Sequence, residues 1–369
     1  MRFVDEFRDP QAARGLVATI HALATTDTAT PLSYMEICGG HTHTIYRHGL
    51  EHLLPETVRL VHGPGCPVCV IPMGRIDDAI WLAEQPDVTL VTFGDLLRVP
   101  GSRGSLLEAK ARGADVRFVY SPLDALTLAQ ALPQRHVVFF AVGFETTAPA
   151  TSATLLQARQ RRLTNFSVFS NHVRIQPPIR AILDSPDLQL DGFVGPGHVA
   201  TVVGTRVFDL VADAYRRPVV VAGFEPLDIL QAIAMLLTQR RDGRCQVENQ
   251  YTRVVRPDGN PAALRLMETT LRVRDFAWRG LGEIPHSGLG VHPDFADLDA
   301  EERFEIPGRA VPDPAACQCG QVLRGALRPW ECKVFGTACT PQTPIGTCMV
   351  STEGACAAYY TYGRLAPTT

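Results

Sequence analysis

Short apolar runs rich in β-branched residues recur through most of this chain and alternate with helix-like stretches. Eight runs have the length and composition of buried strands: residues 33–37, 58–61, 88–93, 116–120, 137–142, 166–169, 192–194 and 219–222. Helical patterns are clearest at residues 73–84, 148–162, 199–215 and 226–239. Strands that alternate with helices are typical of parallel-sheet proteins, so the pattern predicts the α/β class.

Eight strand–helix units could close into a single barrel, but an internal echo favours two lobes. GPG at residues 63–65 and GPG at residues 195–197 each follow a strand and precede another strand that ends in glycine. We therefore predict two similar parallel-sheet lobes divided near Arg135, and a small irregular, mainly helical C-terminal domain. The expected boundaries are an N-terminal helix within residues 1–30, lobes at 31–135 and 136–255, and the C-terminal domain at 256–369.

Composition and charge exclude several classes of protein. The 369 residues carry a net charge of −3, with 46% apolar and 20% charged residues, which argues against disorder and against a nucleic-acid-binding surface. The apolar runs fall far short of the ~20 residues that span a bilayer, and the first residues lack the pattern of a secretory signal. We expect a cytoplasmic protein without a nucleic-acid or membrane partner, whose ten cysteines are reduced and serve metal or redox chemistry.

The last 53 residues contain six cysteines with the spacing C-x-C-x12-C-x6-C-x8-C-x7-C: Cys317, Cys319, Cys332, Cys339, Cys348 and Cys356. An iron–sulfur cluster of the 4Fe-4S type needs four converging thiolates, and the neighbouring glycines and prolines permit the loops that would supply them. Two cysteines are left over, which indicates a redox-active pair beside the cluster. Zinc bound by four thiolates is the alternative, although C-x-C with long spacers departs from the usual zinc pairs.

A second constellation, CGGHTH at residues 38–43, comes directly after an expected strand and before a helix-like stretch. Ligands bind at the carboxyl ends of strands in open parallel sheets, and a helix N-terminus favours thiolate over thiol. Cys38 is therefore the expected reactive thiol, with His41, Thr42 and His43 in the same loop.

A third constellation, GPGCPVC at residues 63–69, also follows a strand and contains the C-x-x-C pair Cys66 and Cys69. This pair should lie at the same edge of the sheet as Cys38. We interpret it as a redox pair that serves Cys38. A zinc half-site completed by Cys38 and His41 is the alternative.

Two later loops, GFETTAP at residues 143–149 and GPGH at residues 195–198, resemble ligand-facing loops because they also follow strands. Glu145 and His198 are either polar site residues or helix-capping groups, and capping is the default for Thr146 and Thr147. Neither a Walker A loop nor a G-x-G-x-x-G fingerprint occurs, so we expect no ATP or NAD site.

Taken in order, CGGHTHT, GPGCPVCVIP, GFETTAP, GPGHV and the closing cysteines closely resemble the HypD family of NiFe-hydrogenase maturation factors, essentially end to end. The resemblance implies a scaffold that assembles the Fe(CN)2CO group with a small HypC-type partner and receives cyanide from HypE and HypF. It implies that Cys38 binds this iron and that His41 is a nearby essential imidazole. Cys66 and Cys69 would then supply electrons or help to bind the iron. Whether any step is catalytic stays open.

The closing cysteines are also similar to those of ferredoxin:thioredoxin reductase, in which a cluster lies beside a redox-active disulfide. That likeness assigns Cys319 and Cys348 to the redox pair, and it assigns the remaining four to the 4Fe-4S cluster: Cys317, Cys332, Cys339 and Cys356. A relay from the cluster through both pairs to Cys38 would explain the number of thiols. Two alternatives are an iron–sulfur thiol–disulfide oxidoreductase acting on protein disulfides, and a structural scaffold whose cluster only stabilises the C-terminal segment.

Overall fold

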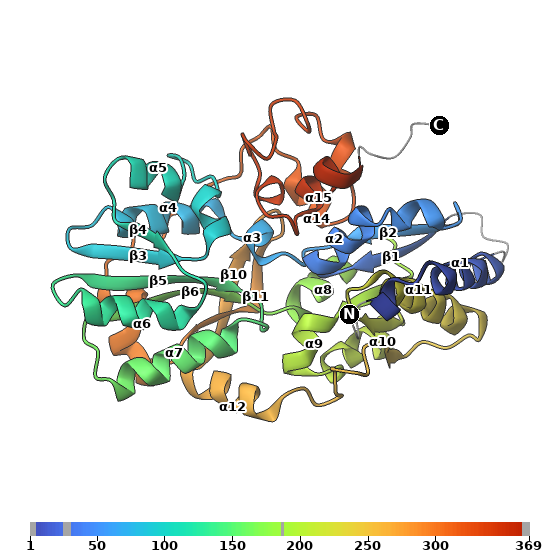
Figure 1. Ribbon diagram of the computed structural model, residues 1–369, viewed down its shortest axis with the longest axis horizontal. Helices are drawn as coiled ribbons and strands as arrows, with labels where there is room; N and C mark the ends of the chain where they lie inside the picture. The colour runs from blue at the N-terminus through green and yellow to red at the C-terminus, as the bar shows by residue number, and fades with distance from the viewer. Residues whose placement is uncertain (1–4, 25–30, 186–187, 364–369) are drawn as a thin grey trace.

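The computed structural model describes residues 5–24, 31–185 and 188–363, and its strands form two separate sheets (Figure 1). The strands are β1 (Leu32–Glu36), β2 (Val58–His62), β3 (Val88–Thr92), β4 (Val116–Phe118), β5 (His136–Gly143), β6 (Phe166–Val173), β7 (Gly192–Pro196), β8 (Val219–Ala222), β9 (Val247–Asn249), β10 (Leu271–Trp278) and β11 (Gly282–Val291). All eight predicted strands are present, and the predicted α/β class is confirmed.

Helices connect most of these strands. The α-helices are α1 (Pro10–Ala24), α2 (Gly39–Arg47), α3 (Pro67–Val70), α4 (Met73–Ala83), α5 (Leu106–Ala111), α6 (Pro122–Ala131), α7 (Ala148–Gln160), α8 (Gln176–Leu183), α9 (Gly197–Val203), α10 (Asp209–Asp213), α11 (Pro226–Arg241), α12 (Pro261–Thr270), α13 (Ala300–Arg303), α14 (Cys319–Leu323) and α15 (Ala355–Tyr362). Short 3-10 helices are η1 (Asp5–Arg8), η2 (Leu50–Leu53), η3 (Gly94–Arg98), η4 (Arg206–Phe208), η5 (Pro293–Leu298), η6 (Pro329–Glu331) and η7 (Thr347–Met349). Several α-helices begin with proline, whose missing N–H has no helical partner at that position anyway.

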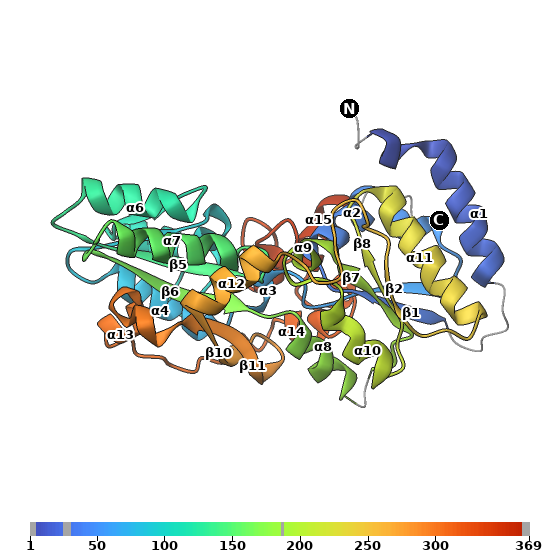
Figure 2. The same cartoon turned by 90° about the horizontal axis from the view of Figure 1, so that it is seen from below.

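The first sheet has the strand order β2-β1-β7-β8-β9, and all its pairs are parallel. Helix α2 follows directly from β1, while α1 and α11 lie side by side on the outside of the sheet (Figure 2). Ile20, Tyr34 and Ile229 belong to the core between them. Helix α1 confirms a helix in the N-terminal region, although residues 1–4 and 25–30 lie outside the described residues.

The second sheet has the order β10-β11-β6-β5-β3-β4. Strands β3 to β6 are parallel, whereas β10 and β11 form an antiparallel hairpin that adds to β6. The sequence pattern does not predict this hairpin. Strand β10 is only partly buried and includes charged residues such as Arg272, Arg274 and Asp275, so it lacks the apolar run by which the other strands are recognised.

The chain passes between the two sheets three times, namely between β2 and β3, β6 and β7, and β9 and β10. The predicted division near Arg135 does not match this topology, because β3 and β4 pair with β5 and β6, while β1 and β2 pair with β7 and β8. Each GPG motif lies at the carboxyl end of a strand of the first sheet, β2 or β7. The internal echo therefore marks two loops at one sheet edge and not two consecutive lobes.

The C-terminal residues from about 313 to 363 lie over the junction between the two sheets (Figures 1 and 2). They contain only short helices and loops, as predicted, and α15 packs against α2. Tyr359 of α15 contacts the rings of Tyr46 and Trp330. Within the described residues, no helix has the length and apolar character needed to cross a membrane.

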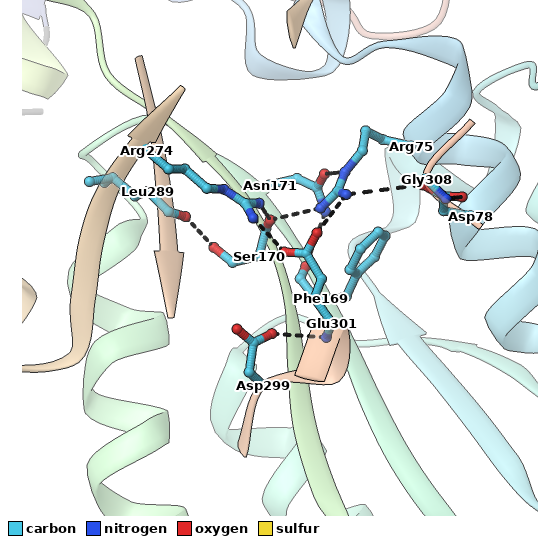
Figure 3. A network of polar contacts seen from close by, with 10 residues as sticks. All are labelled: Arg75, Asp78, Phe169, Ser170, Asn171, Arg274, Leu289, Asp299, Glu301 and Gly308. Carbon is cyan, nitrogen blue, oxygen red and sulfur yellow. Dashed lines mark hydrogen bonds and ion pairs between the residues drawn. The ribbon is translucent and has the colours of Figure 1, made fainter. Parts of the chain in front are cut away.

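A charged network ties the β10–β11 hairpin to the rest of the second sheet (Figure 3). Arg75 of α4 and Arg274 of β10 both reach the carboxylate of Glu301 in α13, at 2.7 Å and 2.5 Å. The Arg75 guanidinium also bonds to Asn171 of β6 at 2.5 Å and lies 4.2 Å above the Phe169 ring. One carboxylate therefore neutralises two largely buried cations and joins elements from distant parts of the chain.

Candidate functional site

Cys38 lies at the carboxyl end of β1 and caps the N-terminus of α2. Its backbone N–H donates a 3.0 Å hydrogen bond to the Glu36 carboxylate. The backbone N–H groups of Gly40 and His41 interact with its sulfur and lower the pKa of the thiol. Burial nevertheless raises the pKa of the thiol, and the carboxyl groups of Glu353 and Glu36 raise it further. The backbone N–H groups at the helix N-terminus favour the thiolate, as expected, but burial outweighs their effect on the pKa. A bound metal cation would reverse this preference, because a coordinating thiol is deprotonated.

The CGGHTH and GPGCPVC loops are in direct contact. The Gly39 N–H donates a 3.1 Å hydrogen bond to the Gly65 carbonyl, and a Cβ atom on Gly65 would lie 2.3 Å from the Cys38 nitrogen. A Cβ atom on Gly39 would lie 2.5 Å from Cβ of Glu353, so the C-terminal segment covers the same loop. These glycines let three segments that are far apart in the sequence meet around Cys38.

His41 and His198 both stack on the ring of Phe224, at centroid distances of 4.8 Å and 3.6 Å. His41 is fully buried, with Nε2 3.2 Å from the Ala222 carbonyl oxygen, and its Nδ1 has no hydrogen-bond partner in the part of the chain that is described. Burial lowers the pKa of both imidazoles, that of His198 to about 4 with a further contribution from His41. Both rings are therefore neutral at pH 7, the state that accepts a proton or binds a metal.

A buried carboxylate, Glu36, supports the CGGHTH loop. It accepts hydrogen bonds from the Cys38 N–H, the Thr42 hydroxyl and Nδ1 of His62, the last at 2.7 Å. Nε2 of His62 lies 3.7 Å from Glu51. Burial alone would lower the pKa of His62, but its hydrogen bond to Glu36 and the charges of both carboxylates raise that pKa to about 9. His62 is therefore protonated at neutral pH and compensates the Glu36 charge.

Replacing His62 with glutamine should change the pH dependence of stability. The pKa of His62 rises from its ordinary value of 6.5 to about 9 on folding, so its stabilising effect is complete below pH 6.5 and disappears as the pH rises through 9. This corresponds to about 3 kcal/mol. Urea unfolding at pH 6.5 and pH 9.5 should show that the wild type loses about this much more stability than His62→Gln. Equal losses in both proteins would contradict the assignment.

His43 contacts the C-terminal segment. Its Nδ1 lies 3.2 Å from the Thr352 carbonyl oxygen, and its ring meets the edge of Tyr362 at a centroid distance of 5.2 Å. Glu353, the next residue after Thr352, is the one that covers Gly39. The loop that carries Cys38 is thus held between the first sheet and the C-terminal segment.

A chain of sulfur contacts runs from the C-x-x-C pair into the C-terminal segment. Cys66 caps α3, and its sulfur accepts a 3.3 Å hydrogen bond from the Cys69 N–H. The Cys348 sulfur lies 3.1 Å from that of Cys319. Cys69 and Cys356 lie near enough to Cys348, and Cys317 to Cys319, for each neighbour to alter the pKa of the other thiol. Burial is the main cause that raises the pKa of Cys69, followed by its bonds to Cys348 and Cys66.

A side-chain hydrogen bond also links these segments, since the Thr347 hydroxyl donates to the Cys69 carbonyl at 2.7 Å. Cys339 is buried in the same apolar cluster, and its sulfur accepts a 3.4 Å hydrogen bond from the Ile345 N–H. Cys332 is half-buried in the loop before it. In the described ranges, no three potential ligand side chains lie close enough together to share a single metal ion.

Glu145 and Cys245 lie apart from the Cys38 site and from the sulfur chain. Glu145 follows β5, and its carboxylate accepts hydrogen bonds from the Ile175 N–H at 3.0 Å and 3.2 Å, at the crossing that precedes α8. Burial raises its pKa to about 7. In the structure, Glu145 fixes the backbone at Ile175, in the segment that leads from β6 of the second sheet to α8. Cys245, the tenth cysteine, is 3.6 Å from the Ala212 carbonyl oxygen and belongs to the edge of the first sheet.

Sequence comparison identifies the relatives of this chain. The sequence profile of HypD, described as "Hydrogenase formation hypA family", matches residues 11–363. A Rhizobium leguminosarum bv. viciae protein named hydrogenase maturation factor HypD is 55% identical over 372 residues, which cover 99% of this chain and 96% of the relative. Proteins of the same name from Cupriavidus necator and Escherichia coli K12 are 51% and 50% identical, covering 99% and 98% of this chain and 98% of each relative.

Proposed function

The chain belongs to the HypD family of hydrogenase maturation factors, and we propose that it is the scaffold on which the Fe(CN)2CO group of a NiFe hydrogenase is assembled. The observation that carries the proposal is the meeting of the Cys38 loop, the C-x-x-C loop and the C-terminal segment at one place. The iron is the cargo of this scaffold. A HypC-type chaperone would share it, and HypE with HypF would deliver the cyanide.

Cys38 is the proposed iron ligand. Cyanide and carbonyl ligands favour low-spin ferrous iron, which a soft thiolate suits better than oxygen ligands. The pKa of the Cys38 thiol is raised by burial when no cation is near, so deprotonation would be coupled to metal binding. Neutral His41, on the same loop, is a candidate base or second ligand. Glu36 holds the backbone of Cys38 in place through its 3.0 Å hydrogen bond.

Cys66 and Cys69 are the proposed electron source for cyanide transfer. Reduction of a thiocyanate at the chain end of the cyanide carrier to a thiol and a cyanide anion consumes two electrons and one proton. A dithiol that becomes a disulfide releases two electrons and two protons, so the pair supplies both electrons and the proton of the new thiol, and the second proton is released. The contacts from Cys69 to Cys348 and from Cys348 to Cys319 support a route by which the pair could be reduced again.

The C-terminal cysteines fit a 4Fe-4S cluster in their chemistry and their grouping. Four of the six cysteines are buried in one apolar cluster, and glycines lie in the loops between them. Their thiolates are the soft donors that iron–sulfur clusters require. In the proposed arrangement the cluster is held by Cys317, Cys332, Cys339 and Cys356, while Cys319 and Cys348 form the adjacent redox pair. The cluster would supply single electrons at low potential. The burial of Cys66, Cys69, Cys319 and Cys348 makes an external protein disulfide a less suitable substrate than an internal relay.

The test is spectroscopic. The full-length protein, isolated anaerobically with its small partner, is expected to show infrared stretching bands of iron-bound cyanide and carbon monoxide. Mössbauer spectra should also show a four-iron cluster in the same sample. A complex with iron but no such bands would refute the scaffold, and stoichiometric zinc in place of four-iron clusters would refute the cluster assignment.

A further inference from the structure

The turn between β10 and β11 contacts two cysteine-bearing helices, α3 on one side and α14 on the other. The backbone N–H of Arg279 in this turn donates a 2.8 Å hydrogen bond to the carbonyl of Val70, the last residue of α3. On the other side, a Cβ atom on Gly280 would lie 2.2 Å from Cα of Gly320 in α14. Arg279 therefore sits where the helix of the C-x-x-C pair and the helix that begins at Cys319 both approach the hairpin.

The guanidinium of Arg279 is buried, and only part of its hydrogen-bonding capacity is used. Its side chain is only 1% exposed, and Nε lies 2.8 Å from Asp313, whose side chain is 33% exposed. Its Nη1 and Nη2 atoms are buried and have no hydrogen-bond partner among the residues that the structure describes. Burying donors without partners costs free energy, so these two nitrogen atoms are available to a further anionic group.

The geometry places this cation beside the start of the cysteine segment. The turn that carries Arg279 contacts Gly320, the residue after Cys319, and Asp313, the ion-pair partner of Arg279, lies four residues before Cys317. A buried cation at this place would favour negative charge on a cluster that is bound through Cys317.

We propose that Arg279 is a cationic residue of the iron–sulfur site, and that its buried charge stabilises the electron added when the cluster bound through Cys317 is reduced. The inference rests on the cluster in the proposed function. One electron enters from a low-potential donor, no bond forms or breaks, and the negative charge of the site increases by one. Because charges interact strongly where water is excluded, Arg279 should raise the midpoint potential, while Asp313 should lower it.

The experiment is a redox titration of the cluster in the full-length protein, followed by electron paramagnetic resonance. Arg279→Gln should make reduction about tenfold less favourable, a shift of about 59 mV to lower potential for a one-electron couple. Arg279→Lys should shift less, because it keeps the charge. Asp313→Asn should shift the potential upward. Arg324→Gln removes an exposed arginine from the end of α14 and should have little effect, because water screens its charge.

The outcomes separate this inference from the proposed function. A wild-type protein without a four-iron signal would overturn both. A wild-type cluster whose potential is unchanged in Arg279→Gln would overturn the inference alone. If Arg279→Gln does not assemble a cluster, Asp313→Asn decides: an upward shift of the potential supports the inference, and an unchanged potential, as a purely structural role predicts, overturns it.

Discussion

Replacing Cys38 with alanine is expected to abolish the cyanide and carbonyl infrared bands of the complex with the small partner. Cys38 is the proposed thiolate anchor of the cargo iron, and it is buried where the two motif loops and the C-terminal segment meet. No substitute thiol of this loop can take its place, since Cys66 and Cys69 belong to a different segment that is engaged with Cys348. The infrared spectrum of the anaerobic complex measures the effect directly.

The controls for this variant come from the same chain. Cys245→Ala removes a cysteine that lies apart from the sulfur chain, and it should keep the infrared bands. Iron bound by the C-terminal cysteines should remain in Cys38→Ala, because the sulfur contacts of that region do not include Cys38. Persistence of the bands in Cys38→Ala would remove Cys38 from the iron site. Loss of the bands together with loss of the cluster would indicate misfolding instead.

The strands and the positions of the motifs at strand ends were predictable from the sequence. Apolar β-rich runs mark strands whether or not their neighbours are known, and parallel sheets place ligand-binding loops at carboxyl ends. That is why Cys38, Cys66 and His198 could be selected, and the structure places all three beyond strands of the first sheet. The residues that surround these three side chains could not be predicted in the same way.

Long-range pairing was not predictable from these patterns. Parallel strands carry no mark of their partner, so the interleaved connections between the two sheets could not be distinguished from two consecutive lobes. Glu36 and His62 lie within or at the end of predicted strands, where polar residues give no signal of the bond between them. Arg279 belongs to a hairpin whose half-exposed strands resemble loop sequence. Each of these residues depends on a neighbour that is distant in the sequence.

The sulfur chain was predictable in part: its cysteines could be grouped from the sequence, but not all of their neighbours could. Spacing alone indicated two cysteines beyond those a cluster needs, and resemblance to a known reductase suggested that they are Cys319 and Cys348. The structure places these two sulfur atoms 3.1 Å apart and adds a contact that spacing could not reveal, from Cys348 to Cys69. That contact joins segments separated by most of the chain, so it follows from the docking of the C-terminal segment over the sheet junction.

Replacing Glu301 with glutamine is expected to destabilise the protein by about 3 kcal/mol, because its carboxylate pairs with both Arg75 and Arg274, and the other carboxylate beside Arg75, that of Asp78, is 4.0 Å away. The two guanidinium groups are mostly buried, and Arg75 is held over the Phe169 ring (Figure 3). Glutamine keeps the size of the side chain but leaves two like charges facing each other. The urea midpoint should fall by on the order of 1 M, whereas Glu302→Gln, at an exposed neighbour, should leave it unchanged.

The same variant tests whether the hairpin positions the cysteine site. Arg274 lies on β10, the strand that leads directly to Arg279, so loss of the Glu301 contact should loosen the hairpin before it affects the first sheet. Hydrogen exchange should therefore increase in β10 and β11 of Glu301→Gln while it stays slow in β1 and β7. Uniformly faster exchange in both sheets would mean that the network stabilises the whole molecule and does not specifically anchor the hairpin.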